Sequence, residues 1–239
     1  MRIAIVSDIH GNRTAFEAVL EDLRLTAPDL IFHGGDLADG GSSPIEIVDQ
    51  IRGLGWPGVM GNTDEMLTRP ESLAEFARRS PNMQPLFNVI AEMGEVTRNR
   101  LGEDRIDWLR SLPRAQQRGP LALVHASPES PWRAPSAEAS DEELQSTYGP
   151  LGSSIVVYGH IHRPYIRRVS GMIVANSGNV SLPYDGDPRS SYLLLDEFTL
   201  TIRRVPYDID REVRALEASV MPHANWIARI LKSGSFVMP

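Results

Sequence analysis

The first 60 residues alternate between strand and helix patterns, and this alternation constrains the fold more than any other feature. Continuous apolar runs are typical of strands buried on both faces, and apolar residues at helical spacing indicate amphipathic helices. In chain order the segments are a strand over 2–7, a helix over 14–25, a strand over 29–32, a helix opening at Ser43-Pro44 and a short strand over 58–60. Strands separated by helices favour parallel pairing in an α/β fold.

The rest of the chain predicts further helices and then mainly strands. We expect a helical insertion over about 66–112 and a long loop over about 126–150 with one short helix near 140–147, all within a single domain over 1–239. Further strands are expected at 121–124, 154–158, 165–169, 172–175, 192–196 and 200–205. A terminal helix over 208–219, with Asp210 as its cap, follows, and the tail after Pro222 has no interpretable pattern.

Composition excludes several kinds of chemistry. The chain has no cysteine, which rules out disulfides, cysteine-bound zinc, iron–sulfur clusters and a thiolate nucleophile. Any metal site must therefore use nitrogen and oxygen ligands. The net charge of −7 gives no strong signal for nucleic-acid binding, which usually requires a basic excess.

Membrane and export signals are not predicted. The apolar start over 1–6 is interrupted by Asp8 and His10, so it is too short for a signal peptide. No apolar run approaches the roughly 20 residues of a membrane span. We therefore expect a cytoplasmic protein without a membrane partner, and the sequence leaves its oligomeric state open.

Polar residues of metal-ligand type follow five predicted strands. Because ligands of open α/β sheets bind beyond the carboxyl ends of the strands, we expect these side chains to meet. The candidate ligands are Asp8, His10, Asp36, Asn62, His125, His160 and His162. Each residue alone has a structural explanation, such as a turn aspartate or a core histidine, and only the set as a whole predicts a site. His33 and His223 lie outside it and are interpreted as structural.

The size and chemistry of this set predict two metal ions. One catalytic metal needs about three protein ligands, whereas two ions that share a carboxylate would use the whole set. Imidazole and carboxylate without sulfur suit manganese, and iron or zinc are alternatives.

The order of the motifs resembles the calcineurin-like metallophosphoesterases. The motifs are Asp8-Ile9-His10, Gly35-Asp36, Gly61-Asn62, the single His125 and Gly159-His160-Ile161-His162. Two further stretches resemble the small bacterial and archaeal phosphodiesterase branch of that family, namely Asn176-Ser177-Gly178-Asn179-Val180 and Asp185-Gly186-Asp187-Pro188-Arg189.

The resemblance implies a fold and a mechanism. The fold would be α/β (α+β), with two mixed sheets packed as a sandwich between helices in αββα order. By the resemblance, one metal would be held by Asp8, His10, Asp36 and His162, and the other by Asp36, Asn62, His125 and His160, with Asp36 as the bridge. A metal-bridging hydroxide would attack phosphorus in line. Asp36, Asn62 and Asp64 would be the catalytic residues.

One position departs from the family pattern. Many members have a histidine directly after Gly-Asn and use it on the phosphate or the leaving group, but here Gly61-Asn62 is followed by Thr63. Threonine cannot act as a general acid near neutral pH, so we expect a phosphodiester or another ester with a good leaving group. Asn12, Asn62 and Thr63 are the expected substrate contacts, and capping of the first helix is an equally good interpretation of Asn12.

Other functions remain open at this stage. Within the family, the chain could be a phosphoprotein phosphatase or a dinucleoside polyphosphate hydrolase. A non-catalytic protein-interaction scaffold on the same fold is an alternative of another class, although such scaffolds tend to lose ligand histidines that this chain retains. The expected substrate is a small-molecule or nucleotide phosphate ester, and its identity cannot be derived from the sequence.

Overall fold

A computed structural model describes residues 1–239 and contains two β-sheets. The first sheet has the strand order β2-β1-β8-β9. Its strands are β1 (Arg2–Val6), β2 (Leu30–His33), β8 (Ser190–Asp196) and β9 (Thr199–Val205). The predicted parallel pairing of the first two strands is confirmed, because β1 and β2 run in the same direction. The strand β8 pairs antiparallel with β1, so the sheet is mixed.

The second sheet has the order β3-β4-β5-β7-β6. Its strands are β3 (Ala115–Arg118), β4 (Leu121–Val124), β5 (Ile155–Tyr158), β6 (Tyr165–Val169) and β7 (Met172–Asn176). The three central strands β4, β5 and β7 are parallel, and the edge strands β3 and β6 are antiparallel to their neighbours. This sheet is therefore mixed as well.

The two sheets pack face to face. Side chains alternate along a strand, so Ile3 and Ile5 of β1 point to the opposite face from Ala4 and Val6. Ile3 and Ile5 pack with Leu121 and other residues of the second sheet, whereas Ala4 and Val6 pack with the helices that cover the first sheet. The predicted αββα sandwich is confirmed by this layering.

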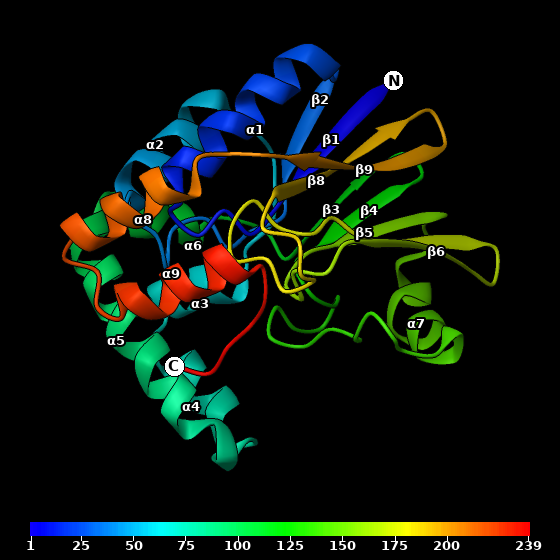
Figure 1. Ribbon diagram of the computed structural model, residues 1–239. Coiled ribbons are helices and arrows are strands. Elements are labelled where there is room, and N and C mark those ends of the chain that lie inside the picture. The colour runs from blue at the N-terminus through cyan, green and yellow to red at the C-terminus, as the bar shows by residue number, and fades with distance from the viewer.

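Helices cover both outer faces, unequally (Figure 1). The helices α1 (Arg13–Thr26) and α2 (Pro44–Leu54) pack on the first sheet, and the short α7 (Asp141–Tyr148) packs on the second. The remaining helices are α3 (Asn62–Thr68), α4 (Glu71–Ala77), α5 (Gln84–Leu101), α6 (Glu103–Arg110), α8 (Ile209–Ala218) and α9 (Ala224–Ser233). Short 3₁₀ turns occur at Pro81–Met83 and Gly149–Leu151. No helix combines the length and apolar character needed to cross a membrane.

Four local expectations need correction. The segment 58–60 forms only a single bridge between Gly58 and His33, because the chain enters α3 at Asn62 immediately afterwards. The polar edge strand β3 was not predicted, since it has no buried face to impose a pattern. The helix α9 was also missed. The cap of α8 is Asp208, which accepts a hydrogen bond from the Arg211 amide at 2.8 Å, and not Asp210.

Candidate metal centre

All seven predicted ligand residues lie in one cluster where the two sheets meet. Asp8 and His10 follow β1, and Asp36 follows β2 in the same sheet. His125 follows β4, and the pair His160 and His162 follows β5 of the other sheet, while Asn62 begins α3. The cluster therefore draws on strand ends from both sheets, which no single open sheet would bring together.

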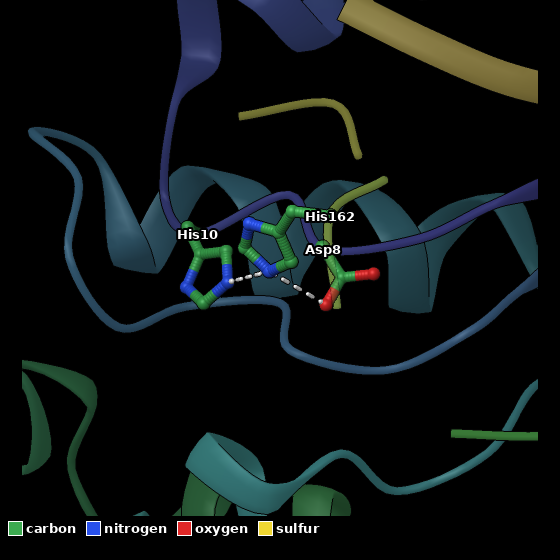
Figure 2. A group of neighbouring side chains, drawn as sticks. All are labelled: Asp8, His10 and His162. Atoms are coloured by element: carbon green, nitrogen blue, oxygen red, sulfur yellow. Dashed lines mark hydrogen bonds and ion pairs between the residues drawn. The ribbon is translucent and has the colours of Figure 1, made fainter. Parts of the chain in front are cut away.

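The first group consists of Asp8, His10 and His162, and Figure 2 shows the His162 ring between the other two side chains. Nε2 of His162 lies 3.1 Å from Oδ1 of Asp8 and 3.4 Å from Nε2 of His10. One potential ligand atom from each residue lies within 4.8 Å of the others, and all three residues are buried. This spacing suits a common metal ion.

The second group surrounds Asn62. Its amide Oδ1 lies 2.9 Å from Nε2 of His125 and 2.8 Å from Nδ1 of His160. Asp36 joins this group through Oδ2, which is 3.5 Å from Nε2 of His125. The same Oδ2 is 3.7 Å from Nε2 of His10 in the first group. Asp36 thus lies between the groups, as a shared ligand must. Asp8 also lies within reach of Asp36 and His125.

Backbone carbonyls orient three of the imidazoles. Nδ1 of His10, His125 and His162 lies 2.7, 2.8 and 2.6 Å from the carbonyl oxygens of Asp39, Gly34 and Leu182, respectively. A carbonyl can only accept, so each Nδ1 carries a proton, and Nε2 is the ring nitrogen that faces the cluster. Such an outer hydrogen bond is typical of histidines that bind metals.

The Asn62 amide lies among the other donors of the second group. With its nitrogen inward it would donate to Asp36, His125 and His160, and with its oxygen inward it would add a ligand atom to theirs. Carboxylate, imidazole and amide groups without sulfur form a donor set that fits a divalent metal.

The backbone at the site adopts an unusual conformation. Left-handed φ angles are uncommon outside glycine, and they concentrate where surrounding structure enforces them for function. Five of the predicted ligand residues have φ between 49° and 65°, namely Asp8, His10, Asp36, His160 and His162. The loops are thus shaped to direct these side chains inward.

Mutual electrostatics alter the acidity of the cluster. Burial alone would raise the pKa of Asp8, but the imidazoles of His162, His125 and His10 hold it well below its usual range. Burial lowers the pKa of His160 to about 4. Burial also opposes protonation of His125 and His162, yet the carboxylates of Asp36 and Asp8 raise the pKa of both rings. The site therefore has a negative field that favours a cation.

Two residues predicted at the reaction centre have positioning roles in the structure. Asp64 is fully buried, and its Oδ2 accepts from the amides of Asp36 and Gly61 at 2.8 and 3.0 Å. Its Oδ1 accepts from the Leu37 amide at 3.0 Å. Both oxygens are therefore used to hold the Asp36 loop, and Asp64 does not line the cavity beside the cluster.

Asn12 is likewise engaged within the fold. Its Oδ1 caps α1 by accepting from the Ala15 amide at 2.9 Å, and its Nδ2 donates to Ser181 at 3.1 Å. The side chain is buried and does not line the cavity beside the cluster. Thr63, in contrast, lines the cavity, and its hydroxyl has no hydrogen-bond partner.

A cavity of about 250 Å³ opens onto the cluster, and the sequence did not predict its walls. Apolar side chains from α5, α9 and the chain end form one side of it, among them Met93, Trp226 and Phe236. Tyr184 stacks on His162 with ring centroids 4.5 Å apart. Asp39 also lines this cavity, and burial raises its pKa to about 7. Only the position of Asp39, three residues after Asp36, could have drawn attention to it.

A sandwich of two mixed sheets with a buried carboxylate–imidazole cluster at its strand ends defines a metallohydrolase. The domain model of the calcineurin-like phosphoesterase superfamily matches residues 1–199. The chain belongs to this superfamily and is a hydrolase that acts on phosphate esters.

Similar proteins support this assignment. An uncharacterized protein of Methanocaldococcus jannaschii is 29% identical, and the match covers 97% of this chain and 98% of the relative. The crystal structure of a metallophosphoesterase from Sphaerobacter thermophilus is 26% identical with a TM-score of 0.80, over 98% of this chain and all of the other. A symmetrical bis(5′-nucleosyl)-tetraphosphatase of Methylococcus capsulatus is 27% identical over 149 residues, or 61% of this chain and 50% of that protein.

Proposed function

We propose that this protein is a dinuclear metal-dependent phosphodiesterase. The observation that carries the proposal is the pair of ligand groups around Asp36, whose Oδ2 lies 3.7 Å from His10 and 3.5 Å from His125. One ion would be held by Asp8, His10, Asp36 and His162, and the other by Asp36, Asn62, His125 and His160. Manganese is the metal we expect first, with iron or zinc as alternatives, because the ligands are nitrogen and oxygen only.

The bound ions would supply Lewis acidity toward the phosphate and activate water near neutral pH. The residues of the chain hold this arrangement in place. Asp64 fixes the Asp36 loop through the backbone amides of Asp36 and Leu37, and the Thr63 amide donates to Oδ1 of Asp36 at 2.9 Å. Oδ1 of Asp36 is thus occupied by a hydrogen bond, which leaves Oδ2 for the metals.

The preference for a diester rests on Thr63. This residue takes the place of the histidine that follows Gly-Asn in many family members, and its unpartnered hydroxyl can donate a hydrogen bond to a phosphate oxygen but cannot protonate an alkoxide near pH 7. A substrate whose leaving group departs without strong acid assistance suits such a site. The apolar wall that includes Met93 and Trp226 would then contact the organic group of the ester.

A dinucleoside polyphosphate is the second candidate substrate. The tetraphosphatase from Methylococcus capsulatus is a partial relative, and its name denotes cleavage between phosphates, where the leaving group is itself a phosphate. A non-catalytic scaffold is less consistent with the chain, since all four cluster histidines and both carboxylates are retained.

The decisive experiment combines metal analysis with two chromogenic esters. The purified protein is expected to bind close to two divalent ions per chain and to hydrolyse bis(p-nitrophenyl) phosphate faster than p-nitrophenyl phosphate in the presence of manganese. Diadenosine tetraphosphate is assayed in parallel. A higher kcat/KM for that compound than for the diester would favour the second candidate.

The variant Asp36→Asn provides the test of the site. It should lose about 10²-fold or more in activity and bind less metal, because a shared carboxylate is replaced by a neutral amide. Asp49→Asn is the matched control, since Asp49 is paired with Arg105 on the outer surface and lies outside the cavity. Full activity in Asp36→Asn, or a protein without metal and without turnover on any ester, would refute the proposal.

A further inference from the structure

A second cavity shares the side chain of Trp132 with the cavity at the metal cluster. Its volume is about 260 Å³, and we call it the arginine cleft. The residues used below are Arg69, Arg79, Arg114, Arg133, Ser72 and Trp132, all of which line it. It brings together α4, the end of α3 and the loop after β4.

The arginine cleft has two guanidinium groups without partners. The guanidinium groups of Arg79 and Arg133 form no ion pair and no hydrogen bond, although that of Arg133 lies over the Phe76 ring at 5.8 Å. In all, four arginines face three glutamates in the lining. The cleft therefore has an excess of positive charge in a protein whose net charge is −7.

The other two arginines are held in place. Oε1 of Glu65 lies 2.7 Å from Arg114 and 3.2 Å from Arg69. Its second oxygen, Oε2, accepts from the Trp132 indole at 2.6 Å. The largely buried Glu65 thus fixes two cations and the wall shared with the metal cavity, and this preorganisation lowers the cost of binding an anion.

Ser72 points independently to a ligand. It is only 2% exposed, and its hydroxyl has no hydrogen-bond partner. A buried hydroxyl without a partner is unfavourable, so its presence in a folded protein calls for an explanation. An acceptor oxygen of a bound anion would satisfy it.

The helix α3 sets the distance between the two cavities. Asn62 begins this helix at the metal cluster, and Arg69 follows its last residue in the arginine cleft. Seven residues at 1.5 Å each correspond to a separation of roughly 10 Å along the backbone. One extended small molecule can span this distance.

We propose that the arginine cleft binds a second phosphoryl group of the substrate, so that the enzyme prefers phosphodiesters with a distal phosphate. Arginine forms bidentate hydrogen bonds with phosphate oxygens, and Arg79 and Arg133 are free to do so. This inference rests on the proposed function for the position of the scissile ester, but the anion site itself is independent of turnover.

The test compares two synthetic diesters that differ only in the distal phosphate. One is p-nitrophenyl 6-hydroxyhexyl phosphate, and the other is the same compound phosphorylated at the 6-hydroxyl, whose spacer is chosen to reach from the metal cluster to the cleft. The wild-type enzyme is expected to show a KM about 10- to 100-fold lower for the phosphorylated compound, with a similar kcat.

Two double variants distinguish binding in the arginine cleft from a general effect of the protein's positive charges. Arg79→Gln/Arg133→Gln should abolish the preference and leave kcat on the unphosphorylated diester unchanged. Arg78→Gln/Arg168→Gln removes the same charge from exposed arginines outside the cleft and should keep the preference. Ser72→Ala should reduce the preference without lowering stability, because its hydroxyl has no partner to lose.

Calorimetry makes the outcome independent of catalysis. Hexane-1,6-diol bisphosphate should bind the wild type more tightly than the monophosphate, and Arg79→Gln/Arg133→Gln should remove the difference. Hydrolysis of the simple diester without any such preference would overturn the arginine cleft and leave the proposed function intact. Bisphosphate-selective binding without hydrolysis of any ester would support the cleft and refute the proposed function. Equal binding of both compounds overturns the inference.

Discussion

Gly61 lies so close to Asp36 that a single methyl group should disable the metal centre. A Cβ added at Gly61 would lie 2.8 Å from Cγ of Asp36, and still closer to its Oδ1 and backbone nitrogen. The contact is not with a flexible chain end, because the Asp36 amide is held by Asp64 and the Asp36 carboxylate by the Thr63 amide. The variant Gly61→Ala must therefore move the backbone of one loop or the other.

The size of the effect follows from these distances. Carbon atoms in contact are about 3.5–4.0 Å apart, so the Asp36 carboxylate has to retreat by about 1 Å. A displacement of that size at a reaction centre costs on the order of 10²-fold in rate. The overpacking itself should lower the free energy of unfolding by about 1–3 kcal/mol.

The assay uses bound metal per chain, kcat/KM on bis(p-nitrophenyl) phosphate and urea unfolding. Gly53→Ala is the control, because a Cβ at this exposed position in α2 meets no atom within 4 Å. It should raise the free energy of unfolding by about 0.5–1 kcal/mol and leave activity unchanged. If Gly61→Ala retained wild-type metal content, activity and stability, our inference that Gly61 closely approaches the Asp36 loop would be wrong.

Three further predictions concern neighbouring residues. Asp64→Asn places an amide nitrogen against backbone N–H groups, so we expect a loss of about 1–3 kcal/mol in urea unfolding and weaker metal binding; unchanged metal affinity would argue against its positioning role. Thr63→His should raise turnover of phenyl phosphate, a monoester with a poor leaving group, by on the order of 10²-fold, and no gain would count against our interpretation of this position. Burial lowers the pKa of His33 to about 3 from 6.5, so the unfolded chain binds a proton below pH 6.5 that the folded chain excludes. Stability is then lost as the pH falls, by about 2 kcal/mol between pH 6.5 and 5, and His33→Phe should remove this part of the pH dependence in the metal-free protein; an equal slope in both proteins would contradict it.

Much of the architecture could be predicted because it depends on local patterns. Apolar runs such as Arg2–Val6 have few alternatives to a buried strand, and the order of the motifs indicated the family and hence the sandwich. The elements that the sequence did not predict correctly differ for physical reasons. The strand β3 is polar and exposed at a sheet edge, so no burial imposes a pattern on it. The segment at Val59 is apolar but too short to pair beyond one bridge before α3 begins.

The sequence by itself determined the donor set of the site. Strand ends carrying Asp, Asn and His without any cysteine restrict the chemistry to nitrogen and oxygen ligands, and this conclusion needs no coordinates. The departure from the family pattern at Thr63 could also be recognised from the sequence, because this residue occupies a defined position in a motif. These features are properties of single residues and their spacing along the chain.

Only the tertiary structure decided what each polar residue does. Asp64 looked available for chemistry, yet backbone amides occupy both of its oxygens, and of the two roles that the sequence left open for Asn12 the structure shows the helix cap. The roles of Asp39 and Gly61, as well as the arginine cleft, depend on contacts between segments far apart in the chain. A hydrogen bond or a close approach of this kind has no sequence pattern, because it arises from how loops of two sheets pack and not from the spacing within either one.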